Sequence, residues 1–314
     1  MNQITVSACI ITYNHEKHIS EAIMGALNQK LDYTYEIVIG EDASSDSTGE
    51  ICREFKKKYP KKIKLIQNNQ NLGMVKNWGN ILNHCTGKYI ALCEGDDYWT
   101  DPHKLQKQID FLENEKDYIL CFHNAWVLDD NGDRIRLFNN NFKNDTFSGK
   151  DLLKTWLMST ASVVFRNILH NDIPDYFYLS THADLSLFLF LADFGKIKYL
   201  NETMGVYRIH SGGITVSRFK GIEHNQKHIN QCKAMNVHFR FKYSLLLKKR
   251  IAEYHIANAQ LYIYENQKKN AIANIKQSFA NYPWMMLIKL KAMIIITIGL
   301  ISYRLLNLLK GNKS

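Results

Sequence analysis

The hydrophobic positions of this chain follow two alternating patterns. Short runs of apolar and β-branched residues, of strand length, are separated by segments in which apolar residues recur every three or four positions, as on one face of a helix. Over the first hundred residues the pattern predicts strands at 5–12, 36–40, 63–67 and 89–93, with helices at 19–27, 47–59 and 74–85 between them. This alternation predicts an α/β fold, in which a mostly parallel sheet is sandwiched by helices.

The pattern is less regular beyond residue 100, but it continues the same domain. It predicts helices at 101–115, 148–157 and 185–194, a hairpin turn at 129–132, and strands at 119–127, 159–165, 197–200 and 205–209. We expect these elements to complete a single α/β domain covering residues 1–218.

The last third of the chain changes to a purely helical pattern. Apolar residues recur at helical spacing over 252–263, and a second helix is predicted over 268–282. The pair resembles one tetratricopeptide-like hairpin. Because a single repeat cannot form a solenoid, we interpret residues 219–283 as a helical appendage.

Residues 284–314 are apolar and basic, without any acidic residue. Their continuous apolar run, 292–303, is shorter than the roughly 20 residues needed to span a bilayer. The composition fits a helix that lies in the membrane interface with its basic residues on anionic head groups. A buried core helix or a dimer contact is the alternative interpretation.

The charge of the chain is concentrated in the same region. Of the +10 net charge, residues 221–314 contribute 15 Lys+Arg against 3 Asp+Glu, a net of +12, so the preceding residues are slightly acidic. This asymmetry points to an anionic partner. The apolar C-terminal stretch favours a membrane surface, and the lack of a nucleic-acid motif disfavours DNA or RNA.

The cysteines and the N-terminus bear on the compartment. The six cysteines form no C-x-x-C pair and no zinc-ligand spacing, and several fall in apolar runs, which favours reduced, buried thiols. Residues 1–14 lack the basic start and the cleavage site of a signal peptide. We therefore expect a cytoplasmic protein that is peripheral on the inner face of the cell membrane.

Three carboxylates crowd the end of the predicted strand at 89–93. Glu94, Asp96 and Asp97 repel one another unless a cation or hydrogen-bond donors compensate their charge. Hard divalent cations prefer oxygen ligands, and Mg²⁺ commonly combines one or two carboxylates with substrate phosphates. A metal–diphosphate site is one interpretation, and a solvated acidic turn that caps the next helix is the other. The G-x-x-x-x-G-K-[ST] and G-x-G-x-x-G fingerprints are absent, so carboxylates and a metal would have to hold a nucleotide.

Several separate motifs occur in order along the first two thirds of the chain. They are Ile10-Ile11-Thr12-Tyr13-Asn14, the run from Ile39 to Thr48, Asn71-Leu72-Gly73, the run from Gly87 to Asp97, Asp184, and Tyr207-Arg208-Ile209-His210. Each motif alone is weak, but together they cover about 200 residues. On these motifs, residues 5–215 resemble the inverting, nucleotide-sugar-dependent glycosyltransferases of family 2, which have a GT-A fold.

The resemblance implies a role for each matched residue. Asp42 would accept the N3–H of uracil. Glu94 and Asp96 occupy the ends of the family's Asp-x-Asp motif, with Glu in place of the first Asp, and His210 would join Asp96 on Mg²⁺ or Mn²⁺. Asp184 would be the general base. The remaining residues expected in the donor pocket are Thr12, Tyr13, Asn14, Glu16, Asn71, Gly95, Asp97 and Arg208.

Each of these roles has a plainer alternative: Asp42 and Asp184 could cap helices, Asn14 could form a turn, and His210 could be structural. With the resemblance, the sequence predicts a metal-dependent inverting transferase. It would move one sugar from a nucleotide-diphosphate sugar, a UDP-sugar by preference, to a hydroxyl of a glycan or lipid-linked acceptor in cell-surface polysaccharide synthesis. The alternative is a catalytically inactive GT-A-fold binding or scaffold module at the membrane.

Overall fold

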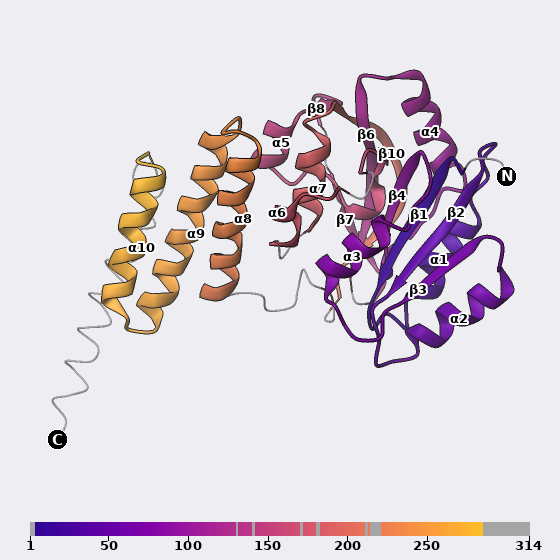
Figure 1. The fold of residues 1–314 in the computed structure, drawn as a ribbon, viewed down its shortest axis with the longest axis horizontal. Coiled ribbons are helices and arrows are strands. Elements are labelled where there is room, and N and C mark those ends of the chain that lie inside the picture. The colour runs from indigo at the N-terminus through magenta and orange to yellow at the C-terminus, as the bar shows by residue number, and fades with distance from the viewer. Residues whose placement is uncertain are drawn as a thin grey trace. The chain divides into compact units, whose positions relative to one another are not determined.

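The structure is a computed structural model, and it describes residues 4–129, 131–139, 142–169, 172–179, 183–210, 213 and 221–284. The chain divides into two compact units, residues 1–218 and 219–314. The first unit is built on a sheet and the second on helices (Figure 1). The predicted segment 284–314 lies outside the described residues, apart from Trp284.

The described part of the first unit contains one sheet of ten strands, in the order β3-β2-β1-β4-β9-β6-β10-β5, with β7 paired to β6 and β8 to β10. The strands β1, β2, β3 and β4 are parallel, whereas β9 is antiparallel to both of its neighbours. The bounds are β1 (Val6–Thr12), β2 (Tyr35–Glu41), β3 (Ile63–Gln67), β4 (Tyr89–Glu94), β5 (Tyr98–Trp99), β6 (Tyr118–Leu128), β7 (Arg134–Leu137), β8 (Thr146–Phe147), β9 (Val164–Arg166) and β10 (Lys196–Arg208).

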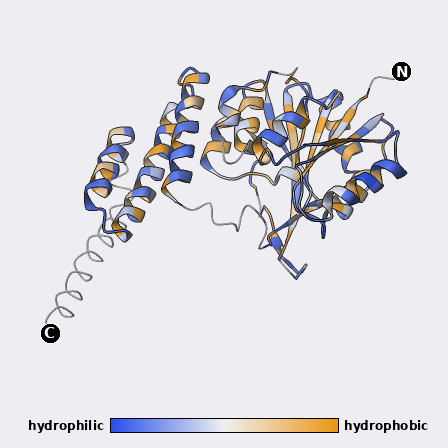
Figure 2. Cartoon of the chain, turned by 60° about the horizontal axis from the view of Figure 1, so that its bottom comes forward, coloured by the Kyte–Doolittle hydropathy of each residue, from blue (hydrophilic) through white to orange (hydrophobic). Residues whose placement is uncertain are grey.

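Helices cover both faces of this sheet (Figure 1). Successive strand side chains point to opposite faces, so Ala8 and Ile10 pack against α1, α2 and α4, while Cys9 and Ile11 pack toward α3, α5, α6 and α7. Both faces of the central strands are therefore buried, and Figure 2 shows these strands as mainly hydrophobic. The helices are α1 (Ile19–Leu27), α2 (Thr48–Lys58), α3 (Met74–Leu82), α4 (Lys104–Asn114), α5 (Gly149–Lys154), α6 (Asp175–Tyr178) and α7 (Ala183–Leu191).

The predicted α/β fold, with a mostly parallel sheet between helices, is confirmed. Two local predictions were wrong. The strands predicted at 197–200 and 205–209 are one strand, β10, whose pairing with β6 shifts register between Leu200 and Gly205. A bulge of this kind breaks the period-2 pattern without ending the strand. The strand predicted at 159–165 begins as a 3₁₀ turn, Thr160–Ser162, and becomes β9 only at Val164.

The direction of the strands decides where the loops meet. The strand β6 runs antiparallel to β9, as β4 does, and β10 is parallel to β6. The carboxyl ends of β1, β2, β4, β6 and β10 therefore share one edge of the sheet. Ligands of open α/β sheets bind outside this edge.

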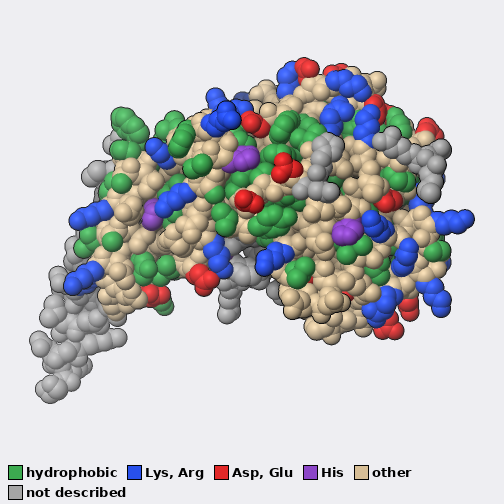
Figure 3. Space-filling model, in the orientation of Figure 1, with side chains coloured by type: hydrophobic (Ala, Val, Ile, Leu, Met, Phe, Trp, Pro, Cys, Tyr) green, Lys and Arg blue, Asp and Glu red, His purple; other side chains and the backbone are tan. Residues whose placement is uncertain are grey.

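The second unit consists of three described helices, α8 (Ile222–His238), α9 (Ser244–Tyr264) and α10 (Lys268–Asn281). Its core is partly polar: the buried Ser278 hydroxyl donates to the Ala252 carbonyl at 2.9 Å, and the Asn225 amide donates to the buried Asn258 at 2.8 Å. Several Lys and Arg side chains stand on the face that Figure 3 presents. Within the described residues, no helix is long and apolar enough to cross a membrane.

All six cysteines are buried and free, as their apolar surroundings in the sequence predict. A more costly burial is that of Lys104, at the start of α4, whose side chain is completely enclosed. Its Nζ lies 4.2 Å from the centroid of the Trp99 ring and makes no hydrogen bond to any described residue. Burial lowers the pKa of Lys104 to about 7 from an ordinary value of 10.5.

Replacing Lys104 with Met should stabilise the fold, because Met fills similar space without a desolvated amine. We expect the free energy of unfolding at pH 7 to rise by about 1–4 kcal/mol, the range seen when buried charges give way to apolar residues. Between about pH 7 and pH 10 the unfolded chain keeps a Lys104 proton that the folded chain has released, so wild-type stability rises with pH in this window. The variant should lose this rise.

The measurement is urea unfolding at several pH values, with Lys116→Met as the matched control. Lys116 has a side chain that is 66% exposed, so its replacement should change stability by no more than about 0.5 kcal/mol. A Lys104→Met protein that is clearly less stable than wild type would show that Lys104 is held by polar contacts.

Candidate active site

The acidic residues that follow β4 form a tight turn against the end of β1. The Gly95 amide donates to the Ile11 carbonyl at 2.8 Å, which continues the pairing of the two strands into the turn. A Cβ on Gly95 would lie 2.5 Å from Thr12 Oγ1 and 2.8 Å from His15 Nδ1. The turn therefore requires glycine at this position, so that two loops can approach each other closely.

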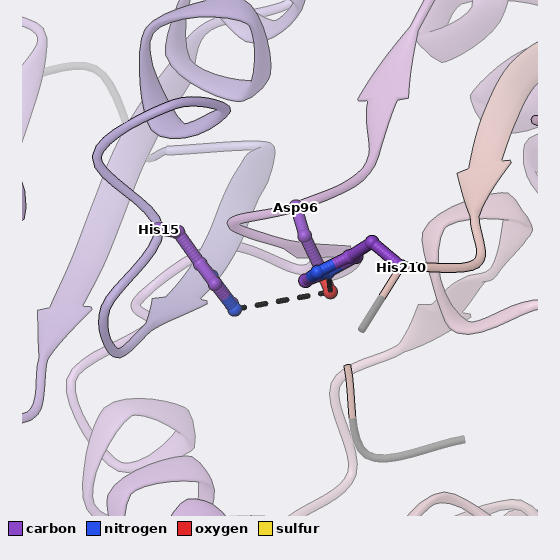
Figure 4. A group of neighbouring side chains, drawn as sticks. All are labelled: His15, Asp96 and His210. Atoms are coloured by element: carbon purple, nitrogen blue, oxygen red, sulfur yellow. Dashed lines mark hydrogen bonds and ion pairs between the residues drawn. The ribbon is translucent and has the colours of Figure 1, made fainter. Parts of the chain in front are cut away.

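Asp96 lies at the centre of a cluster of possible metal ligands (Figure 4). Its Oδ2 is 3.0 Å from His210 Nε2 and 3.8 Å from His15 Nε2. One donor atom from each of the three side chains lies within 4.8 Å of the other two. Two imidazole nitrogens and a carboxylate oxygen are suitable ligands for a divalent cation. The residues present therefore fit the metal that the sequence predicts.

The electrostatics of this cluster favour an ionised Asp96 carboxylate, and they lower the pKa of the His15 imidazole. Burial raises the pKa of Asp96, but the hydrogen bond with His210 and the charges of His15 and His210 outweigh it, so that the pKa is lowered. Burial also lowers the pKa of His15. A neutral imidazole keeps the lone pair that a metal needs.

Asp97, the next residue, is almost completely buried. Its Oδ1 accepts the Arg208 backbone amide at 2.8 Å, while its Oδ2 has no hydrogen-bond partner within the described residues. Burial and the charges of Asp96 and Glu94 raise the pKa of Asp97 well above its usual range. Asp97 therefore ties the acidic turn to the end of β10.

Arg208 braces the same turn. Its Nη1 donates to the Asp96 carbonyl at 2.6 Å and its Nη2 pairs with Glu21 of α1, while the guanidinium lies 4.6 Å from the centroid of the Tyr98 ring. These contacts use much of the hydrogen-bonding capacity of the Arg208 guanidinium. Its predicted role on a diphosphate stays a prediction, beside this clamping role.

The loops after β1 and β2 are joined by reciprocal hydrogen bonds. The Ser45 amide donates to Asn14 Oδ1 at 2.8 Å, the Ser47 amide donates to Glu16 Oε2 at 3.1 Å, and the Glu16 amide donates to Asp46 Oδ2 at 3.1 Å. Asp46 also accepts the amide of Thr48, the first residue of α2. Asn14 and Glu16, which the sequence predicts to line the pocket of the nucleotide-sugar donor, thus hold the two loops together.

Asp42 is buried at the end of β2, where it organises the loop after β3. Its carboxylate accepts hydrogen bonds from Asn68 Nδ2 at 2.7 Å and from the amides of Leu72 and Gly73 at 2.9 Å. Asn71 Oδ1 accepts the same Gly73 amide. A carboxylate has about four acceptor positions, so one remains for the predicted contact with a base.

Glu94 and Asp184 lie close enough for their charges to interact. Burial and the charges of Asp96 and Asp184 raise the pKa of Glu94 well above its usual range, although a hydrogen bond with Thr160 opposes the shift. Burial raises the pKa of Asp184 to about 6, while its bond from the Leu185 amide, 2.7 Å long, opposes the shift. At neutral pH Asp184 is ionised and basic enough to accept a proton.

The described structure therefore brings Thr12, Gly95, Asp96, Asp97, Arg208 and His210 into direct contact and sets Glu94 and Asp184 beside them. Tyr13 is 41% exposed next to this group, and Asn71 is exposed in the loop after β3.

Sequence reasoning missed His15, because it assigned Tyr13, Asn14 and Glu16 to the donor pocket and gave the histidine between them no role. The available signal was its place three residues beyond the end of a strand that leads to the ligand edge.

The comparisons with known proteins agree with this geometry. Residues 7–173 match the model of the family described as "Glycosyl transferase family 2", which is more than half of the chain. The chain belongs to glycosyltransferase family 2.

Among the curated relatives, an uncharacterised protein of Mycobacterium tuberculosis is 36% identical over 220 residues, which are 68% of this chain and 61% of the relative. The chain thus spans less than two thirds of that relative's length. The teichuronic acid biosynthesis glycosyltransferase TuaG of Bacillus subtilis is 25% identical over 68% of this chain and 83% of its own.

Two solved structures share the fold. Residues 1–349 of Staphylococcus aureus TarS, in complex with UDP-GlcNAc, superpose with a TM-score of 0.59 at 18% identity, covering 87% of this chain and 91% of that one. The mannosyltransferase PcManGT of Pyrobaculum calidifontis, in complex with GDP-Man and Mn²⁺, gives a TM-score of 0.52 at 14% identity, covering 95% and 87%. These likenesses establish the GT-A fold.

Replacing Gly95 with Ala should disturb the packing of the acidic turn. The added Cβ would meet Thr12 and His15 at distances that no real contact shows, so these loops must shift. Overpacking of this kind costs about 1–3 kcal/mol. Urea unfolding measures the loss, and Gly221→Ala is the control because a Cβ there meets open space. Equal stability of both variants would contradict the described contact.

Proposed function

We propose that this protein is an inverting glycosyltransferase that moves a single sugar from a nucleotide-diphosphate sugar to a hydroxyl of a glycan or lipid-linked acceptor. The observation that carries the proposal is the grouping of two kinds of site at one sheet edge. The cluster of His15, Asp96 and His210 suits a cation that holds a diphosphate, and beside it lies Asp184, a buried carboxylate suited to proton transfer.

The donor would be held by residues at the ends of β1, β2, β4 and β10. Asp96 and His210 would bind Mg²⁺ or Mn²⁺, and the bound cation would offset the charge that develops on the leaving diphosphate. Asp42 retains an acceptor position for uracil N3–H, and Thr12 and Tyr13 line the adjoining loop. Arg208 fixes the backbone of Asp96 and adds positive charge to the site.

Asp184 would take the proton of the acceptor hydroxyl as its oxygen attacks the anomeric carbon opposite the diphosphate. One displacement inverts that carbon and requires only one base. A buried carboxylate with its pKa near 6 is ionised at pH 7 and more basic than an exposed Asp. Glu94 lies nearby, and its own high pKa leaves Asp184 as the more readily ionised of the two.

The nature of the donor and of the product is supported by the relatives. TarS was solved with UDP-GlcNAc, and a UDP-sugar is our first choice of donor. PcManGT was solved with GDP-Man, so GDP-sugars are the main competitor. TuaG is named for teichuronic acid biosynthesis, which supports a role in the synthesis of a cell-surface polysaccharide. A thermal-shift panel of UDP-, GDP-, dTDP- and CMP-sugars, with and without Mn²⁺, distinguishes these donors.

The composition of the C-terminal third supports a location of the protein at a membrane surface. Its net charge of +12 and its apolar stretch favour binding to an anionic lipid surface. We therefore place the protein in the cytoplasm, peripheral on the inner face of the cell membrane, where a lipid-linked acceptor is within reach.

Replacing Asp184 with Asn should reduce sugar transfer by at least about 10³-fold, within the range for loss of a general base. Asn has the shape of Asp but cannot accept the proton. Affinity for the nucleotide sugar should stay within about threefold of wild type. Product formation from a labelled UDP-sugar measures the first quantity and calorimetry the second.

The control for this variant is Asp175→Asn on α6, which changes an exposed carboxylate and should leave turnover unchanged. The Asp184→Asn protein should be at least as stable as wild type at pH 7, because a desolvated charge is removed. Unchanged turnover would exclude Asp184 as the base. A wild-type protein that binds no nucleotide sugar would favour the inactive scaffold instead.

Reversing the charge of Lys289, Lys291 and Arg304 to Glu should abolish flotation with anionic vesicles. Each basic residue near such a surface contributes about 1 kcal/mol, so losing three weakens binding roughly 100-fold. The matched control reverses three exposed residues of α8 and α9, Lys227, Lys233 and Lys248. Equal loss in both variants would mean that total charge, and not the C-terminal segment, drives the binding.

A further inference from the structure

We propose that His15 is a third protein ligand of the cation, and that it makes the site prefer transition metals such as Mn²⁺ and Co²⁺ over Mg²⁺. This inference rests on the proposed metal-assisted binding of the donor. It goes beyond the carboxylate of Asp96 and the imidazole of His210, because a second nitrogen ligand changes which metal the site selects.

The first observation is convergence. The Nε2 atoms of His15 and His210 both point at Oδ2 of Asp96, at 3.8 and 3.0 Å (Figure 4). Neighbouring ligands of a six-coordinate cation with bonds of about 2.1 Å lie roughly 3 Å apart. The distances of 3.0 and 3.8 Å from Asp96 Oδ2 are near this spacing, and all three donor atoms lie within 4.8 Å of one another.

The second observation is that His15 is held in this orientation by the rest of the fold. Its Nδ1 lies 3.2 Å from Thr12 Oγ1, which leaves Nε2 to face Asp96. Its backbone amide donates to Thr48 Oγ1 at 2.8 Å, and Gly95 leaves the space that the ring occupies. A partner on the second ring nitrogen is the usual way in which proteins orient a histidine ligand.

The third observation is access. The side chains of His15, Asp96 and His210 are 17%, 17% and 14% exposed, so the cluster is not fully enclosed by the protein. His15, Asp96 and His210 would hold the cation from the protein side, and the diphosphate of the donor would supply further oxygen ligands.

The chemical type of the ligand atoms then determines which metal ion the site binds most tightly. Mg²⁺ prefers a shell of oxygens and gives up its water reluctantly. Imidazole favours first-row transition metals, whose affinities rise from Mn²⁺ to Co²⁺. Two nitrogens and one carboxylate oxygen therefore favour Co²⁺ and Mn²⁺ over Mg²⁺, whereas one nitrogen and one carboxylate would discriminate less.

His18 is the matched comparison. Its ring centroid lies 5.2 Å from that of His210, but it is not one of the three residues whose donor atoms converge. It is a histidine on the same loop and near the same cluster, so its replacement tests whether position, and not histidine content, matters.

The experiment uses the full chain and the metal ions alone. Calorimetry with MnCl₂ and MgCl₂ compares wild type, His15→Gln and His18→Gln, and pulsed EPR of bound Mn²⁺ counts the imidazole nitrogens on the metal. We expect wild type to bind Mn²⁺ at least tenfold more tightly than Mg²⁺ and to show two nitrogens. His15→Gln should show one nitrogen and lose at least tenfold in Mn²⁺ affinity, and His18→Gln should match wild type within threefold.

The EPR count on wild type does not depend on any variant folding. A single nitrogen, or equal binding of Mn²⁺ and Mg²⁺ by wild type, would overturn the proposal. Loss of Mn²⁺ binding in His210→Gln but not in His15→Gln would also overturn it, while leaving the metal-assisted transferase intact. Failure of the proposed function is seen separately, as absence of sugar transfer with every donor and metal.

Discussion

The site depends on the parallel pairing of β1 with β2 on one side and with β4 on the other. This pairing aligns Thr12 with Glu41 and Ile11 with Glu94, so three loops leave the sheet at the same level. The hydrogen bond from Gly95 to Ile11 then holds the acidic turn against the loop that carries His15. A shift of one residue in either pairing would turn these side chains to the other face of the sheet.

Much of this could be predicted from the sequence, because strand ends are marked by local chemistry. The acidic run after Cys93 and the cap residues after Gly40 stand at the boundary between apolar and polar residues. What could not be predicted are features that arise between segments. The bulge that keeps β10 continuous breaks the alternation of its side chains, so the pattern gave two strands. His15 has only a weak local signal, its place just beyond the end of β1, because its partner Asp96 meets it only in the folded chain.

The polar residues at the sheet edge have different structural roles. Asn14 and Glu16 accept backbone amides of the neighbouring loop, and Asp97 and Arg208 tie the acidic turn to β10. These side chains hold Asp96 and the neighbouring loops in place, so the proposed metal ligands would need little rearrangement to bind a cation. Such preorganisation is what makes electrostatic stabilisation effective in a transferase. Residues that brace and residues that bind can look alike in a sequence, since both must be polar.

The long strand β10 has a consequence for how the protein forms during synthesis. His210 follows it and meets Asp96 across a separation of 114 residues. Contacts between residues this far apart in the sequence form late in folding, because closing the long intervening loop costs entropy before the contact adds any stability. Chains emerge from the ribosome N-terminal end first, so β1 to β4 are available well before β10. The metal cluster is therefore assembled only after nearly the whole α/β unit has been made, which keeps an incomplete chain from presenting a finished site.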